Sequence, residues 1–317
     1  MLALLFRHRC AGLYRFAGLA LVLFWLPVAA SAQAGFSAAP KGLLYRIYGA
    51  HAGPKIVPGD FISVNLVVRT DGDSLLMSTY QSGYPVVQVV PKSEPGEVQS
   101  ALQYLTEGDS ATVKVNIDSL SSAAKGRMPV KGKYIVYNLK IEKVIARGTL
   151  TDTVFNARIK DYMTVQTDAL KQAEPGRIKK YAADKGLAVT VTASGLNYVI
   201  TRAGQGAPIA AGDTAVVWYT ARFVNDKLLE TNMEQLARQG NIYKAELGVY
   251  KPLHIEVGAK RAIPGWDEGL QLLSKGAKAT FIMPSALAYG ADGFSGAVPP
   301  YCPMVFEIEV VDVVRGH

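Results

Sequence analysis

The sequence repeats itself, and this internal repeat limits the chain to folds that contain two similar units. The run Gly42-Leu-Leu-Tyr45-Arg-Ile47, with Gly53, Ile56 and Gly59-Asp60 after it, returns 153 positions later as Gly195-Leu-Asn-Tyr198-Val-Ile200, Gly206, Ile209 and Gly212-Asp213. A repeat at constant spacing indicates duplicated structural units. With 317 residues the chain also exceeds the usual size of one domain. We therefore expect two related domains.

The spacing between the two copies changes once along the chain. Five residues of the first copy correspond to residues 168 positions later: Leu102, Leu105, Gly108, Ala111 and Thr112 match Leu270, Leu273, Gly276, Ala279 and Thr280. The second copy therefore carries an insertion of about 15 residues, which we place between Glu230 and Leu253. Within it, Met233-Glu-Gln-Leu-Ala237 predicts one or two helical turns before Gly240, in a loop beside any pocket.

The first 32 residues have the pattern of a targeting segment. Arg7, Arg9 and Arg15 precede an apolar run from Phe16 to Leu26, and the small residues Ala30-Ser-Ala32 follow Pro27. This predicts a signal peptide over residues 1–32. A membrane anchor is the competing interpretation, but it needs about 20 apolar residues and this run is shorter. We expect an exported, periplasmic protein that is soluble, without a stable membrane anchor, after cleavage.

The charge and the cysteines limit the class of partner and the crosslinks. Removing the predicted signal removes three arginines and no acids, so the net charge falls from +8 to +5. No dense basic cluster remains, which argues against a nucleic-acid partner. Of the two cysteines only Cys302 follows the signal, so no intramolecular disulfide is expected. We expect Cys302 to act as a small apolar residue beneath a loop.

Helical spacing characterises the segment between the copies. Phe155, Ile159, Tyr162 and Met163 recur at helical intervals in residues 152–171, and a second run from Pro175 ends at Gly186. We interpret this segment as two helices that join the domains. The apolar stripe is expected to pack against the chain itself, although a dimerisation helix would have the same spacing.

A lone tryptophan stands in the most informative stretch of the second copy, Ala262-Ile-Pro-Gly-Trp266-Asp-Glu-Gly-Leu270. Pro264 and Gly265 predict a turn, and the two acids follow where a helix N-terminus favours negative charge, so Trp266 lies in the first turn of a short helix. Strand patterns flank it: Val216-Val-Trp-Tyr219 and Pro252-Leu-His-Ile-Glu-Val-Gly258 before it, and Met304-Val-Phe-Glu-Ile-Glu-Val310 after it, with Ala288-Tyr-Gly290 and Val298-Pro-Pro300 between. Taken alone, Trp266 fits an ordinary core residue equally well.

The order and spacing of these segments, from about Ser194 to Val314, resemble the FKBP family of peptidyl-prolyl cis/trans isomerases. The resemblance implies an α+β fold in which an antiparallel sheet wraps a short helix, and the tryptophan of that helix floors an apolar pocket. We expect a degenerate FKBP-like domain over residues 41–146, a helical linker over 147–190 and an FKBP-type isomerase domain over 191–317.

The resemblance also assigns the site residues. It implies catalytic roles for Tyr219, Glu230, Trp266, Tyr289 and Phe306, and substrate-binding roles for Leu229, Leu253, Ala262, Ile263, Phe294, Ala297 and Val298. In it the Tyr289 hydroxyl and the Ile263 backbone N–H donate hydrogen bonds to a ligand. Phe306 and Ile255 could equally be core residues of alternating strands. Tyr289 lies in a glycine-rich segment, where a tyrosine contributes little to a core and its hydroxyl needs a partner, so function is favoured there.

This sequence departs from the family pattern at several of these positions. Glu230 stands in place of a usual aspartate, Leu229 and Leu253 replace usual aromatics, and Ala262 replaces a larger aliphatic residue. Phe294 also lies where other side chains are common. The longer acid can still reach the Tyr219 hydroxyl. The smaller walls should widen the pocket and weaken macrolide inhibitors more than peptides.

In the first copy the site positions carry other residues. Leu66 stands where the second copy has Tyr219, Met77 where it has Glu230, and Val98 where it has Trp266. The first copy therefore keeps a scaffold and loses the pocket, and we expect activity only in the second.

The predicted activity is isomerisation of X-Pro bonds in unfolded or partly folded polypeptides. No cofactor or metal is implied, because His51, His254 and His317 lack paired ligand spacing and the glycines of 290–296 lack the lysine of a phosphate loop. Two alternatives remain: a periplasmic holdase chaperone or peptide-binding module with little isomerase activity, and a scaffold. Intact aromatic positions favour the enzyme, while Leu229 and Ala262 leave room for a binding module.

Overall fold

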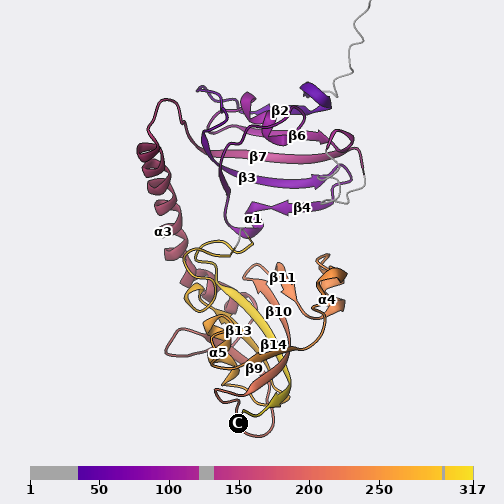
Figure 1. The fold of residues 1–317 in the computed structure, drawn as a ribbon, viewed down its shortest axis with the longest axis vertical. Helices are drawn as coiled ribbons and strands as arrows, with labels where there is room; N and C mark the ends of the chain where they lie inside the picture. Colours follow the sequence, from indigo (N-terminus) through magenta and orange to yellow (C-terminus); the bar gives the residue numbers. More distant parts are fainter. Residues whose placement is uncertain (1–34, 121–131, 295–296, 317) are drawn as a thin grey trace, which may run out of the picture.

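Two antiparallel sheets, joined by one long helix, make up the computed structural model (Figure 1). The structure describes residues 35–120, 132–294 and 297–316, and the predicted signal peptide lies outside these ranges. Within them no helix is both long enough and apolar enough to cross a bilayer. The α+β fold predicted from the sequence is confirmed.

The first sheet contains β1 (Ser37–Ala38), β2 (Leu44–Tyr48), β3 (Phe61–Thr70), β4 (Leu75–Ser78), β5 (Val86–Val89), β6 (Ser110–Asn116) and β7 (Tyr134–Ile145). Its strand order is β1-β2-β6-β7-β3-β4, and β5 also pairs with β3. Four short helices accompany it: η1 (Pro40–Gly42), α1 (Thr79–Ser82), η2 (Val98–Tyr104) and η3 (Ile117–Ser119). The core lies between the sheet and η2, where Leu102 packs with Val64, Val113 and Ile141.

The second sheet repeats this topology strand for strand. It contains β8 (Thr190–Val191), β9 (Asn197–Arg202), β10 (Thr214–Phe223), β11 (Leu228–Thr231), β12 (Leu253–Glu256), β13 (Lys278–Met283) and β14 (Met304–Val314). The order is β8-β9-β13-β14-β10-β11, with β12 also paired to β10. Between the strands lie α4 (Glu234–Gln239), η4 (Ala245–Leu247), α5 (Pro264–Leu270) and η5 (Ser285–Leu287). The predicted helical turn of the insertion is confirmed as α4.

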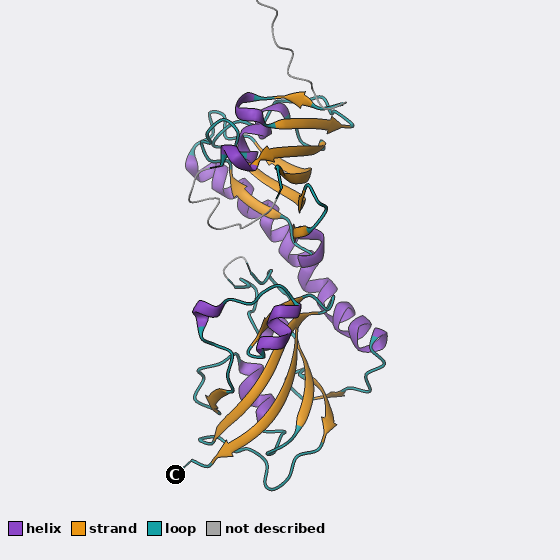
Figure 2. Cartoon of the chain, turned by 90° about the vertical axis from the view of Figure 1, so that its right-hand side faces the viewer, coloured by secondary structure: helices purple, strands orange, loops and turns teal. Residues whose placement is uncertain are grey.

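The linker is a single helix, α3 (Asp152–Asp184), and not the two helices that the sequence indicated (Figure 2). Pro175 lies inside it, where a proline removes one backbone hydrogen bond and normally kinks or breaks a helix. Tertiary packing on both sides of the proline holds the helix together. Phe155 packs with Phe61 and Ile145 of the first sheet. The far end packs on the second sheet through Ile178, Tyr181 and Ala182, against Ile282 and Val305.

Candidate functional site

An open cavity of about 520 Å³ lies where the sequence placed the site, between the second sheet and α5. Strands β10, β11, β12 and β14, the start of α5 and the loop after η5 all contribute to its wall. It is lined by Tyr219, Ala221, Glu230, Leu253, Ile255, Arg261, Ala262, Ile263, Pro264, Trp266, Tyr289 and Phe306. Aromatic and aliphatic side chains form most of this wall, as is usual for a site that binds an uncharged group.

Trp266 is placed by the close approach of α5 to the sheet. The helix starts with Pro264, and two glycines of α5 face strand β13. A Cβ atom at Gly265 would lie 2.5 Å from Met283 Sδ, and one at Gly269 would lie 2.7 Å from the Phe281 ring. Any larger residue at these two positions would lift the helix off the sheet. The glycines therefore set the depth of the Trp266 ring, which is only 4% exposed.

Two aromatic rings meet the tryptophan edge to face. The Tyr219 centroid lies 5.1 Å from that of Trp266, and the Phe306 centroid lies 5.6 Å from it. This T-shaped geometry is the favourable one for aromatic pairs, because the positive edge of one ring meets the negative face of another. The three side chains come from α5, β10 and β14, so they form the site only in the folded domain.

Glu230 and Tyr219 interact across neighbouring strands. Glu230 pairs with Ala221 in the β10–β11 ladder, which brings its carboxylate to the Tyr219 hydroxyl, and that hydroxyl donates a hydrogen bond to Oε1. Burial raises the pKa of Tyr219 well above its ordinary value, and the bond to the Glu230 carboxylate raises this pKa further. The phenol thus stays neutral at physiological pH. Its proton is engaged by the acid and does not point freely into the cavity.

Tyr289 supplies the second hydroxyl of the cavity. Its side chain is half-buried, and burial, followed by the Glu230 charge, raises the pKa of the phenol. Tyr289 therefore remains a hydrogen-bond donor at neutral pH. No hydrogen bond joins its hydroxyl to another residue within the described part of the chain. The Phe294 ring lies beside it, with the centroids 5.3 Å apart.

The structure brings eight of the twelve predicted site residues to this cavity: Tyr219, Glu230, Leu253, Ala262, Ile263, Trp266, Tyr289 and Phe306. The other four lie elsewhere. Leu229 packs against the core, because adjacent residues of a strand face opposite sides and Glu230 takes the side of the cavity. Val298 is buried in the core, Ala297 is exposed, and Phe294 touches Tyr289 from the rim, 55% exposed.

Four lining residues were not among those predicted. Ala221 and Ile255 stand two positions after Tyr219 and Leu253, so strand alternation could have identified both. Pro264 was assigned only to the turn. No sequence signal marked Arg261, which adds a cation at the rim, 3.5 Å from Glu256 Oε2.

The first domain has a cavity of about 260 Å³ at the corresponding place. The registers match, since Met77 pairs with Val68 as Glu230 pairs with Ala221. Leu66, Met77, Val98 and Tyr137 line this cavity where the second domain has Tyr219, Glu230, Trp266 and Phe306. The first domain therefore keeps an apolar hollow without the acid, the tryptophan or a Tyr289 equivalent.

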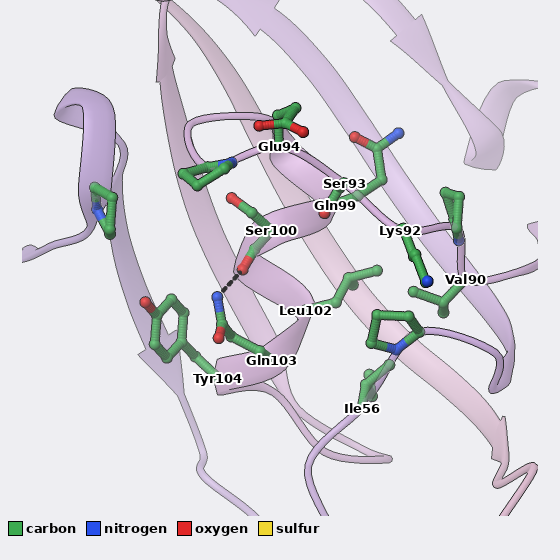
Figure 3. Close-up of a pocket in the computed structure, with 14 residues that line it drawn as sticks. Ile56, Val90, Lys92, Ser93, Glu94, Gln99, Ser100, Leu102, Gln103 and Tyr104 are labelled. Atoms are coloured by element: carbon green, nitrogen blue, oxygen red, sulfur yellow. Dashed lines mark hydrogen bonds between the residues drawn. The ribbon is translucent and has the colours of Figure 1, made fainter.

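A different cavity of the first domain, about 480 Å³, lies on the other side of η2 (Figure 3). Polar side chains and prolines line it, and Gln103 Nε2 donates to the Ser100 carbonyl oxygen at 2.8 Å. It contains none of the residues to which the sequence assigned chemistry.

Comparison with known proteins gives the same assignment as the geometry. Residues 206–311 match the family model of the FKBP-type peptidyl-prolyl cis-trans isomerases. A probable FKBP-type peptidyl-prolyl cis-trans isomerase of Haemophilus influenzae is 29% identical over 199 residues, which cover 62% of this chain and 71% of that protein. FkpA, the FKBP-type isomerase of Escherichia coli K12, is 28% identical over 213 residues, which cover 66% and 68%. The crystal structure of Escherichia coli FkpA aligns with 52% of this chain and 74% of its own, at 28% identity and a TM-score of 0.41. The region that contains Trp266 and its cavity is an FKBP-type peptidyl-prolyl cis-trans isomerase domain.

Proposed function

We propose that the second domain isomerises X-Pro peptide bonds in unfolded or partly folded exported polypeptides. One observation carries this proposal: a cavity floored by Trp266 and walled by Tyr219 and Phe306, with the Tyr289 hydroxyl beside them as a neutral donor. Such a cavity accepts a proline ring and offers a hydrogen bond to a neighbouring carbonyl. The family of the domain supports the same activity.

The chemistry fits an apolar cavity that lacks a nucleophile. Rotation about a peptide bond passes through a twisted amide about 18–20 kcal/mol above the planar form, and no covalent bond is made or broken. Catalysis therefore requires only that the site bind the twisted form more tightly than the planar one. The planar amide is the more dipolar form and loses more on leaving water, so an apolar wall favours the twisted amide.

Separate roles follow for the polar groups. Tyr289 donates to the carbonyl oxygen of the bound peptide. Glu230 acts through Tyr219, whose ring orientation it holds by accepting the phenolic proton. With Ala262 and Leu253 in place of larger walls, macrolide inhibitors bind weakly.

Export to the periplasm is the second part of the proposal. It rests on the arginines and the apolar run of residues 1–32. N-terminal sequencing of the protein recovered from a periplasmic extract tests it. A start near residue 33 is expected, and an intact Met1 in the membrane fraction would contradict export by cleavage.

Turnover of a proline tetrapeptide tests the activity. The full-length protein should accelerate cis-to-trans conversion, and Tyr289→Phe should lower kcat/KM by about three- to tenfold, the effect of losing one hydrogen bond. No acceleration by the wild-type protein at micromolar concentration would contradict the proposed activity.

A peptide-binding role for the first domain is the second candidate, and the 260 Å³ cavity favours it. Its wall is almost wholly aliphatic, and the exposed apolar side chains of Leu75, Leu76 and Met77 extend it along the free edge of β4. A degenerate FKBP-like domain of this kind would hold apolar segments of the same client. Binding of an unfolded protein without turnover of the tetrapeptide would favour this role over the enzyme.

A further inference from the structure

Glu174 is a buried carboxylate contributed to the second domain by the linker helix. Its residue is only 8% exposed, although Ala173 and Pro175 on either side of it are exposed. Both carboxylate oxygens have partners on one residue: the Ser285 backbone N–H donates to Oε1, and the Ser285 hydroxyl donates to Oε2 at 2.9 Å. A buried charge is stable only when its oxygens are hydrogen-bonded, so this contact determines where Glu174 can lie.

Ser285 is the first residue of η5, and this helix has no local cap. The residue before it is Pro284, whose side chain cannot accept a hydrogen bond. The first N–H groups of a helix need acceptors from elsewhere. Glu174 supplies that acceptor from α3, 111 positions away in the sequence.

Hydrogen bonds continue from Ser285 to both neighbours of Tyr289. The Ser285 carbonyl oxygen accepts from the Ala288 N–H at 2.8 Å and from the Gly290 N–H at 2.8 Å. The backbone on each side of Tyr289 is thus fixed to the residue that Glu174 holds. Glu174 itself does not line the cavity that contains Tyr289.

The same turn also adjoins the tryptophan helix. The Leu287 carbonyl oxygen lies 3.1 Å from the position of a Cβ atom at Gly265, next to Trp266. A displacement of η5 would therefore alter the floor of the cavity as well as the donor at its rim.

We propose that Glu174 is a positioning residue: through Ser285 it holds the loop that aims the Tyr289 hydroxyl into the cavity. This inference rests on the proposed role of Tyr289 as a donor. It also makes the linker helix a part of the isomerase site, because α3 carries the only side chain that caps η5 within the described chain.

Three substitutions in the full-length protein separate positioning from general stability. Glu174→Leu removes both acceptors at similar volume. Glu174→Gln keeps them in effect, because its amide oxygen accepts from the Ser285 N–H and its NH₂ group can donate to the Ser285 hydroxyl oxygen. Asp168→Leu is the matched control, since it removes an acid from an exposed position of the same helix.

Glu174→Leu should lower kcat/KM for a proline tetrapeptide by about three- to tenfold, whereas Glu174→Gln and Asp168→Leu should stay within about twofold of wild type. In a Tyr289→Phe background the Glu174→Leu substitution should cost little more, because the two act on the same hydrogen bond. Full additivity of the two losses, or an equal loss in the glutamine variant, would overturn the proposal.

Amide hydrogen exchange gives a readout that does not depend on turnover. Exchange at Ala288 and Gly290 should be faster in Glu174→Leu than in wild type, with β13 and β14 unchanged. If wild type shows no turnover but the exchange result holds, the proposed isomerase activity fails and the loop contact stands. Unchanged exchange at both amides would refute the positioning role, and Ser285→Ala, which removes only one of the two bonds, provides the same test if Glu174→Leu does not fold.

Discussion

Trp266 meets the ring of Tyr219 edge to face, with the centroids 5.1 Å apart and the ring planes at 84°. Phe306 approaches at a similar angle, 81°, with its centroid 5.6 Å from that of Trp266. Two edge-on contacts hold the indole more firmly than one, because each resists rotation of the ring. The floor of the cavity is therefore a rigid surface, suited to a ligand that must be held while its peptide bond turns.

Substitution of the floor should impair turnover more than folding. Trp266→Leu removes both aromatic contacts, each worth about 0.5–1.5 kcal/mol, so kcat/KM for a proline tetrapeptide should fall by about tenfold. Trp218→Leu is the matched control, since Trp218 precedes Tyr219 on β10 and its side chain faces the other side of the sheet. A Trp266→Leu protein that unfolds, judged by circular dichroism, would instead indicate a purely structural residue.

Alkaline pH should destabilise the contact between the linker helix and the second domain. Burial, with the nearby Asp226 and Glu307 carboxylates, raises the pKa of Tyr181 to about 12 from the model value of 10.0. The folded state therefore keeps a proton that the unfolded chain loses, so this contribution is complete below pH 10 and is lost as the pH rises from 10 to about 12. Its size is about 1–2 kcal/mol after allowance for screening by solvent.

Tyr181→Phe removes this ionisation and should flatten the pH dependence of the free energy of unfolding above pH 10. Urea unfolding followed by tryptophan fluorescence measures it, because Trp218 and Trp266 both lie in the second domain. Tyr80→Phe, at an exposed position of the first domain, is the control. Parallel curves for Tyr181→Phe and wild type between pH 9 and 12 would contradict the assignment.

A charge in the first-domain cavity should affect long substrates only. If that cavity holds a segment of the client, it raises the effective concentration of prolines at the second domain. Met77→Lys should then slow the catalysed refolding of a proline-limited protein several-fold and leave tetrapeptide turnover unchanged. Val89→Lys, which adds the same charge outside the cavity, should change neither rate. Equal losses in both assays for Met77→Lys would mean that the first domain only supports the second.

Macrolide affinity should respond to the small wall residue Ala262. Ala262→Val adds two methyl groups to the cavity wall, and about 0.8 kcal/mol for each buried carbon predicts a Kd roughly tenfold lower. Isothermal titration with a macrolide measures the change. The tetrapeptide KM should shift less, because a short peptide covers less of the wall. A weaker macrolide complex in this variant would show that the cavity is not wider at Ala262.

The sequence alone determined the features that depend on local pattern and on residue order. The repeat predicted two similar sheets, and the strands and the short helix followed from the alternation of apolar residues and from Pro264-Gly265. Resemblance in family order placed Tyr219, Trp266 and Phe306 at the site, and the structure brings them to one cavity.

Only the tertiary structure decided which neighbours meet across the chain. Pro175 predicted a break in the linker, but packing against both domains keeps α3 continuous, because the energy of burying Phe155 and Ile178 outweighs one lost backbone hydrogen bond. No local pattern could pair Glu174 with Ser285, since a contact across 111 positions depends on how α3 lies on the second sheet. Ala297 and Val298 likewise lie outside the cavity because the loop turns on the hydrogen bonds between Phe294 and Val298, which place one side chain in solvent and the other in the core.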